Sequence, residues 1–373
     1  MSIESEWNSL SDETGPAKVV LLHDPSAGLR GTVVIDNVAC GPAIGGVRMA
    51  PDVGVVEVAR LARAMTFKNA AAGLPHGGGK GGIVADPAMD PVRKERLVRA
   101  FGRAIRTLSD YIPGPDMGTD ERCMGQLHDE IGRAVGLPAV MGGIPLDTIG
   151  ATGFGLAVCA EVAQELCDLR LRGARVAVQG FGAVGRHAAR FLVERGAILV
   201  AAGDSRGATA NPDGLDVEQL IAFKTEGGSL SGFPGGRAIG AEELLAVDCD
   251  VWVPAARPDV LDAGNAGRLR ARLVLQGANI PATAEAEAIL HQRGVVSVPD
   301  FIANAGGVIC AAVEYHGGTQ TQAFSVIAEK IAANTRTVLE HARERQVPPR
   351  QAAVALARAR VREAASYRQR STA

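Results

Sequence analysis

The stretch that decides the fold runs from residue 174 to 207 and reads ARVAVQGFGAVGRHAARFLVERGAILVAAGDSRG. It begins with a short apolar run, RVAVQ, and continues with closely spaced glycines. A helical pattern and a second apolar run follow. This order of strand, glycine turn, helix and strand predicts a βαβ unit.

The glycines of this stretch form the pattern G-x-G-x-x-G at Gly180, Gly182 and Gly185. The first permits a tight turn, the second lets a pyrophosphate approach the backbone, and the third lets helix and strand pack closely. Free N–H groups and the dipole at the start of the helix would favour the anion. We therefore expect a dinucleotide to contact the whole turn: Gly180, Phe181, Gly182, Ala183, Val184 and Gly185.

Asp204 ends the second apolar run, where an acid binds the adenosine ribose in this fingerprint. It favours NAD as the cofactor. NADP stays possible, because Arg206 could pair with a 2′-phosphate. Asp204 could also serve only as a cap in the turn GDSRG.

The remaining patterns predict an α/β protein of two domains. Residues 19–41 read as two strands joined by a loop, residues 53–73 as a helix, and residues 320–373 as helical. Three later apolar runs alternate with helical stretches, as in a parallel sheet: 249–256, 271–279 and 294–301. The Gly- and Pro-rich stretch 136–153 is the expected hinge. We expect a first domain over 1–149, joined by helices of 330–373, and a Rossmann-type domain over 150–329.

Composition and charge exclude several partners. The chain has 373 residues, is 47% hydrophobic and carries a formal net charge of -2, so neither nucleic acid nor a membrane surface is an expected partner. The polar, acidic start does not resemble a secretion signal. Six cysteines are spread singly, so we expect no metal site, no disulfide framework and a cytoplasmic location.

Chemistry is predicted in the first domain. Lys68 and Lys80 bracket the turn NAAAGLPHGGG and could share one cleft, where two nearby cations lower each other's pKa. A lysine tuned in this way can act as a base. The glycines around Lys80 are expected to leave space beside it. Asp116, in YIPGPDMGTD, could carry a proton. Each residue also has a structural interpretation without catalysis. Lys68 could be a snorkelling helix lysine, Lys80 a surface charge or phosphate contact, and Asp116 a turn residue.

Together these stretches resemble the glutamate, leucine, valine and phenylalanine dehydrogenase superfamily. The resemblance rests on segments that follow the family's order: GPAIGGVRMAP (41–51), MTFKNAAAGLPHGGGKGG (65–82), PGPDMGT (113–119), ATGFG (151–155), VAVQGFGAVG (176–185), NPDGLD (211–216) and PDFIANAGGV (299–308). It implies NAD(P)-dependent oxidative deamination of an L-amino acid in a cleft between the domains of a homo-oligomer.

The resemblance also implies roles for residues of this chain. Lys68 would bind the α-carboxylate of the substrate, Lys80 would activate water, and Asp116 would move protons at the amino group. Thr152 and Asn304 would contact the nicotinamide amide and the substrate, and Asn279 would lie near the cofactor ribose.

The substrate side chain is the harder question. Glutamate-specific members place a lysine and a serine where this chain has Ile44 and Ala311. Without a cation, burial of a second carboxylate costs several kcal/mol, so we expect a leucine-, valine- or phenylalanine-like substrate. The expected substrate contacts are Ile44, Gly45, Met65, Lys68, Gly114, Asn304, Val308 and Ala311. The alternatives are a glutamate dehydrogenase that uses another cation, such as Arg48, and a catalytically silent NAD-binding sensor.

Overall fold

A computed structural model describes residues 10–368 as two compact units. One unit comprises the described chain up to Pro145 together with 308–323 and 356–368, and the other comprises 146–307 and 324–355. The first nine residues of the polar start and the last five of the expected C-terminal helix lie outside the described residues. Within residues 10–368, no helix combines the length and apolar character needed to cross a membrane.

The C-terminal helices divide between the units differently from the predicted bounds. The break at Pro145 falls inside the stretch 136–153, but most of α12 (Gln320–Arg345) and the start of α13 (Pro349–Ser366) belong to the second unit. Arg350 is one reason, because its guanidinium contacts the carboxylates of Glu287 and Asp300 at 2.7 and 2.9 Å.

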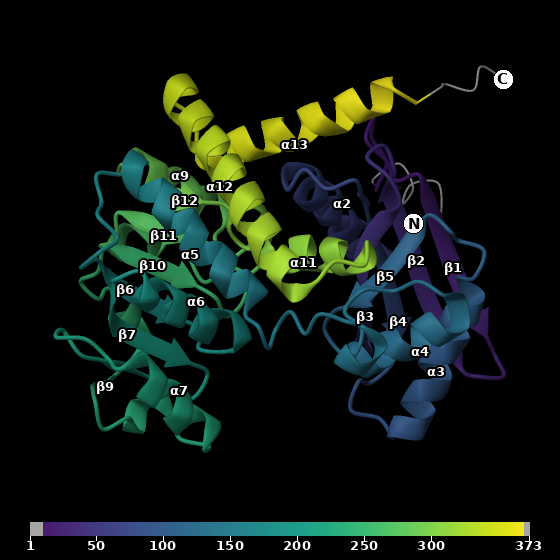
Figure 1. Ribbon diagram of the computed structural model, residues 1–373, viewed down its shortest axis with the longest axis horizontal. Coiled ribbons are helices and arrows are strands. Elements are labelled where there is room, and N and C mark those ends of the chain that lie inside the picture. Colours follow the sequence, from purple (N-terminus) through teal and green to yellow (C-terminus); the bar gives the residue numbers. More distant parts are fainter. Residues whose placement is uncertain (1–9, 369–373) are drawn as a thin grey trace. The chain divides into compact units, whose positions relative to one another are not determined.

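The first unit contains a five-stranded sheet (Figure 1). Its strands, in spatial order, are β1 (Lys18–Asp24), β2 (Leu29–Asn37), β4 (Gly77–Val84), β3 (Ala43–Ala50) and β5 (Tyr111–Pro115). The first two form an antiparallel hairpin, which confirms the prediction for residues 19–41. The strands β4, β3 and β5 are parallel to one another.

Helices cover both faces of this sheet. Val34 packs with α2 (Val55–Ala71) on one face, whereas its neighbours Val33 and Ile35 pack with the helices α3 (Pro91–Ala104) and α4 (Glu121–Ile131) on the other. Successive side chains of a strand point to opposite faces, which accounts for this division. The helix α11 (Gly306–Tyr315) contributes Ala311 to a smaller apolar cluster of the same unit.

The glycines of GLPHGGGKGG allow close packing of the sheet. The expectation that they leave space around Lys80 is wrong. From Gly77 on they form β4. A Cβ added at Gly78 would lie 2.0 Å from the backbone N of Thr66 in α2, and one at Gly81 would lie 2.9 Å from Phe101. The space beside Lys80 comes from Gly46 on β3, where an added Cβ would lie 3.3 Å from Nζ. The run is glycine-rich because a helix and aromatic side chains approach the strand closely.

The second unit contains a seven-stranded sheet (Figure 1). Its strands, in spatial order, are β12 (Val296–Val298), β11 (Leu273–Leu275), β10 (Val251–Pro254), β6 (Arg175–Gln179), β7 (Ile198–Asp204), β8 (Gly207–Ala210) and β9 (Arg237–Ile239). The five from β12 to β7 are parallel, and β8 and β9 are antiparallel additions. With α6 (Ala183–Glu194) between β6 and β7, the predicted βαβ unit is confirmed.

The remaining helices are short or belong to this second unit. They are α5 (Ala151–Ala163), α7 (Val217–Thr225), α8 (Ala241–Leu245), α9 (Ala284–Gln292), α10 (Asp300–Ala303) and the single turns η1 (Ala139–Met141), η2 (Gln164–Leu166), η3 (Leu230–Gly232) and η4 (Ala266–Arg268). The core under α8 and α9 includes Trp252 of β10 and Val274 of β11.

Candidate active site

Lys80 is a buried lysine beside a carboxylate. It lies on β4, and its Nζ is 3.1 Å from Oδ1 of Asp116. Burial lowers the pKa of Lys80 below its ordinary value of 10.5; Asp116 opposes this, and the charge of Arg48 adds to it. A lowered pKa was expected from a neighbouring lysine, but burial is the main cause. A buried ammonium costs free energy that the neutral amine does not.

Asp116 is held in place by its loop. It follows β5, its backbone N donates to Oγ1 of Thr119 at 3.1 Å, and that hydroxyl donates to the carbonyl of Val47 at 2.7 Å. Gly118 has φ +81°, and a Cβ there would lie 2.2 Å from the carbonyl O of Met49. The loop therefore packs tightly against β3, and this packing fixes the position of the Asp116 backbone.

Arg48 completes this cluster, although the sequence suggested it only as a binder of the substrate side chain. Its Nε donates to Oδ2 of Asp116 at 2.9 Å, and NH1 donates to Oε1 of Glu57 at 2.6 Å. Strand alternation could have revealed it, because residues 44, 46 and 48 share one face of β3. The Arg48 guanidinium is therefore already paired with two carboxylates.

Lys68 lies in the last turn of α2 and is half-buried. The next residue, Asn69, donates from Nδ2 to the carbonyls of Gly77 at 2.6 Å and Ile44 at 3.3 Å. These bonds fix the end of the helix on β3 and β4. Lys68 and Lys80 thus belong to neighbouring, mutually anchored elements.

An apolar cluster of the first unit contains two of the expected substrate contacts. Ile44 and Ala311 are buried there with Ile112 and Val135, which the sequence did not single out. Gly114, another expected substrate contact, lies close to Val135, since a Cβ at that glycine would lie 3.0 Å from Val135 Cγ2.

The other residues without charge that were expected to contact the substrate side chain are Met65, Val308 and Gly45. Met65 and Val308 are half-buried. A Cβ at Gly45 would lie 1.6 Å from the carbonyl O of Gly79, so strand pairing already requires glycine at this position.

The turn after β6 fits a pyrophosphate. Gly180 has φ +98°, and a Cβ at Gly185 would lie 1.8 Å from the carbonyl O of Gly180, so both positions require glycine. At Gly182, the N-cap of α6, an added Cβ would meet no atom of residues 10–368 within 4 Å, and no side chain of that part of the chain caps the helix. Ala183 and Val184 begin the helix, while the Phe181 side chain is buried. Open space and uncapped N–H groups are what an anion needs.

Asp204 ends β7 and already has partners. Its Oδ1 accepts from the backbone N of Arg206 at 2.8 Å, and its Oδ2 pairs with Lys224. Burial raises the pKa of Asp204, but these contacts outweigh burial and leave the pKa below its usual value. The Arg206 guanidinium donates to the carbonyls of Gly227 and Gly228 at 3.1 and 2.8 Å. Asp204 thus caps a turn as well as lying at the expected ribose position.

Asn304 and Asn279 meet in the second unit. Nδ2 of Asn304 donates to Oδ1 of Asn279 at 3.0 Å, whereas Oδ1 of Asn304 is buried with no hydrogen-bond partner within residues 10–368. Thr152 lies on α5, and a Cβ added at Gly307 would be 3.1 Å from its Oγ1. A buried acceptor without a donor favours a ligand at this point.

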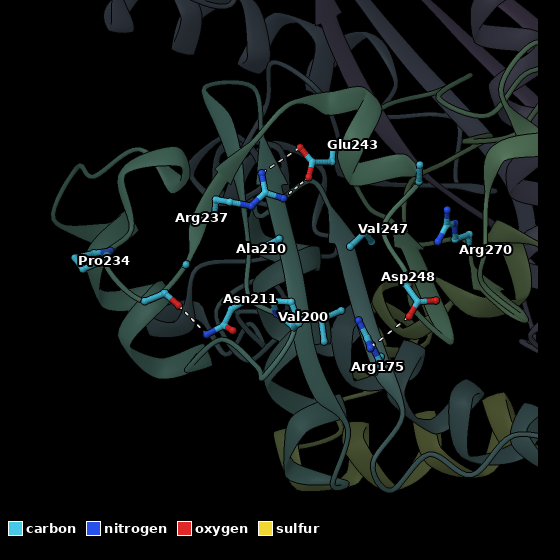
Figure 2. Close-up of a pocket in the computed structure, with 14 residues that line it drawn as sticks. Arg175, Val200, Ala210, Asn211, Pro234, Arg237, Glu243, Val247, Asp248 and Arg270 are labelled. Carbon is cyan, nitrogen blue, oxygen red and sulfur yellow. Dashed lines mark hydrogen bonds and ion pairs between the residues drawn. The ribbon is translucent and has the colours of Figure 1, made fainter.

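A pocket of about 690 Å³ lies away from these residues, on the second unit (Figure 2). Its lining includes Arg175 at the start of β6 and Arg237 at the start of β9. These arginines pair with Asp248, at 3.4 Å, and with Glu243. None of the predicted site residues line this pocket.

Two family descriptions match the chain. Residues 142–369 match "Glutamate/Leucine/Phenylalanine/Valine dehydrogenase", and residues 16–133 match "Glu/Leu/Phe/Val dehydrogenase, dimerisation domain". Together they cover most of the sequence.

Similar curated proteins are glutamate dehydrogenases. The enzyme of Aeropyrum pernix is 40% identical over 82% of this chain and 77% of its own. The NADP-specific enzyme of Saccharolobus shibatae is 39% identical over 75% and 69%, and the NAD-specific enzyme of Staphylococcus aureus is 36% identical over 89% and 84%.

Similar solved structures include a hetero-hexameric glutamate dehydrogenase from Thermus thermophilus in a leucine-bound form. It has a TM-score of 0.84 and 33% identity, over 95% of this chain and 90% of that one. L-tryptophan dehydrogenase from Nostoc punctiforme has a TM-score of 0.76 and 26% identity, over 97% and 99%.

Proposed function

The chain belongs to the glutamate, leucine, phenylalanine and valine dehydrogenase family, and from this premise we propose that it oxidatively deaminates L-glutamate, reversibly, to 2-oxoglutarate and ammonia. The relatives of 36–40% identity support this substrate, although the side-chain positions Ile44 and Ala311 had favoured an apolar one. The observation that carries the chemistry is the buried Lys80 beside Asp116, with a lowered pKa.

Each charged residue has a role in this proposal. Lys68 binds the substrate α-carboxylate. Lys80, whose pKa is lowered because burial disfavours its ammonium, takes a proton in its neutral form from the water that attacks the imine carbon. Asp116 holds and returns protons at the substrate nitrogen. Lys80 lies on β4 and Asp116 directly follows β5, and both strands pair with β3, so the separation of the two groups is fixed before substrate arrives.

NAD fits the turn after β6, and NADP remains an alternative cofactor, since relatives use one or the other. When bound, the nicotinamide supplies a two-electron hydride acceptor. Gly180 to Gly185 would hold the pyrophosphate, Asp204 the adenosine ribose, and Thr152 and Asn279 the nicotinamide side. Oδ1 of Asn304, which has no hydrogen-bond partner among the described residues, would accept a hydrogen bond from the substrate.

An apolar L-amino acid is the second candidate substrate, favoured by one observation. Ile44 and Ala311, at the expected side-chain positions, pack with Ile112 and Val135 and have no cation among them. A γ-carboxylate buried there would lose its hydration without a partner. The nearby cation Arg48 is engaged by Asp116 and Glu57.

A substrate panel tests the proposal. Purified protein is assayed with ammonia and NADH or NADPH on 2-oxoglutarate, branched-chain and aromatic 2-oxo acids. Dominant kcat/KM on 2-oxoglutarate supports glutamate. Dominant activity on an apolar oxo acid supports an apolar L-amino acid as the substrate instead. No turnover on any of these oxo acids indicates a catalytically silent NAD-binding sensor.

The assembly and the location belong to the same proposal. The family's dimerisation domain covers residues 16–133, and the similar Thermus enzyme is a hetero-hexamer, which supports a homo-oligomer here. A cytoplasmic site of action is proposed on the scattered cysteines alone.

A further inference from the structure

A chain of ionic contacts extends from Lys80 toward solvent within the first unit. Lys80 contacts Asp116 at 3.1 Å, Asp116 contacts Arg48 at 2.9 Å, and Arg48 contacts Glu57 at 2.6 Å. The side chains are exposed by 6% at Lys80, 19% at Asp116, 18% at Arg48 and 43% at Glu57. Glu57 is thus the most exposed side chain of the chain of contacts, and Lys80 is the most buried.

We propose that Arg48 is a positioning residue that fixes the Asp116 carboxylate, with Oδ1 turned to Lys80, and that Glu57 in turn anchors Arg48. The inference rests on the proposed dehydrogenase function, in which Asp116 and Lys80 move protons. Arg48 acts through these two residues and does not bind substrate.

The geometry explains why an arginine stands here. Its Nε serves Asp116 and its NH1 serves Glu57, so one planar group holds two carboxylates in fixed directions. A lysine ammonium is a point charge on a flexible stem and fixes no such plane. Gly46 allows the approach, because a Cβ there would lie 2.7 Å from Asp116 Cβ.

The same arrangement influences the proton affinity of Lys80. Burial is the largest effect on its pKa and lowers it; Asp116 and Glu57 raise it, and Arg48 lowers it. The charge of Asp116 also acts on Tyr111 of β5, a buried phenol whose pKa is raised far above its usual value by burial and by this charge, so it stays neutral. Loss of Arg48 is therefore expected to raise the pKa of Lys80, and loss of Glu57 to lower it.

The test uses the full chain with Arg48→Gln, Arg48→Lys and Glu57→Gln. Arg63→Gln is the matched control, because Arg63 also bridges two carboxylates of the same unit, Asp36 at 2.9 Å and Asp12 at 2.6 Å. Two properties are measured against pH: kcat with KM, and the acetylation of Lys80 by acetic anhydride, followed by mass spectrometry. Circular dichroism confirms that each variant is folded.

We expect Arg48→Gln to lower kcat about a hundredfold, as for an ångström-scale misplacement of a catalytic group. Its Lys80 labelling midpoint should move to higher pH, whereas Glu57→Gln should move it to lower pH. Arg48→Lys should keep the midpoint, through its charge, but recover only part of kcat. Arg63→Gln should change neither property.

Folded Arg48→Gln with the kcat and labelling midpoint of the unchanged protein overturns the inference. So does a variant whose only defect is a higher KM for 2-oxoglutarate, since that places Arg48 on the substrate side chain. If the unchanged protein turns over no oxo acid, the proposed function fails, but the labelling midpoints still decide whether Arg48 sets the state of Lys80.

Discussion

At the scale of single residues, Lys80 owes its expected reactivity to burial. Its neighbours Asp116 and Glu57 would otherwise keep it protonated, as a carboxylate near an ammonium usually does. The desolvated position on β4 outweighs them. Asp204 shows the opposite balance, because hydrogen bonds from Lys224 and Arg206 outweigh its burial and keep it ionised.

Lys80→Ala is expected to lower kcat by about 10²- to 10⁴-fold, the usual contribution of a general base. In the unchanged protein the rate should fall as pH drops through the pKa of Lys80, which lies below 10.5, because the protonated amine cannot accept a proton. Steady-state kinetics across pH measure both effects. Lys94→Ala, in α3, is the control and should retain full activity; an active Lys80→Ala protein contradicts the mechanism.

Lys224→Gln is expected to raise the preference for NAD over NADP about tenfold or less. Without Lys224, the carboxylate of Asp204 is no longer neutralised by its ammonium and repels a 2′-phosphate more strongly. The ratio of kcat/KM for the two cofactors measures the change. Lys18→Gln, which removes a surface pair with Asp110, should leave the ratio unchanged. A shift toward NADP would show that Lys224 does not act through Asp204.

At the scale of elements, the glycine-rich strand β4 lies between α2 and the aromatic core. Its missing side chains allow Thr66 on one face and Phe101 on the other to approach. The same closeness lets Asn69 bond to the β3 and β4 carbonyls, which anchors the end of α2 that carries Lys68. The strand thus positions both lysines.

Gly78→Ala is expected to lower the free energy of unfolding by about 1–3 kcal/mol or more, the usual cost of an overpacked core. The new methyl would lie 2.0 Å from the Thr66 backbone, which cannot move without α2. Urea denaturation measures the loss. Gly54→Ala, where an added Cβ meets nothing within 4 Å, is the control and should cost less. Equal losses in both variants would contradict this account of β4.

At the scale of the whole molecule, the substrate and cofactor residues divide between the units. Lys68, Lys80 and Asp116 belong to the first, and the glycine turn and Asp204 to the second. The first unit also carries the family's dimerisation match. Its outermost strand, β1, pairs with β2 on one side and exposes Leu21 by 72%. An outer strand with an exposed apolar side chain favours pairing with a second copy.

Leu21→Lys is therefore expected to reduce the assembled mass in solution. A lysine on an outer strand opposes edge-to-edge association, because its charge would be desolvated in the contact. Multi-angle light scattering of the unchanged and altered proteins measures the mass. Val92→Lys, exposed by 77% on α3, is the control and should assemble normally. An unchanged mass for Leu21→Lys places the contact elsewhere.

The sequence alone determined the parts that depend on local patterns. The βαβ unit at 174–207 and the roles of Gly180 and Gly185 follow from strand periodicity and from backbone conformations that glycine permits. Side-chain interactions across strands are not local. For that reason Arg48 was considered only as a cation for the substrate side chain in the glutamate alternative, and Ile112 and Val135 were not predicted at all.

Only the tertiary structure decided how the catalytic residues meet. Val47 of β3 pairs with Gly81 of β4 and with Pro115 of β5, so Lys80 and Asp116 arrive on either side of the strand that carries Arg48. The order β4-β3-β5 differs from the order in the chain. A strand pattern fixes which residues share a face, but the neighbours of a strand depend on long-range pairing, which no local pattern encodes.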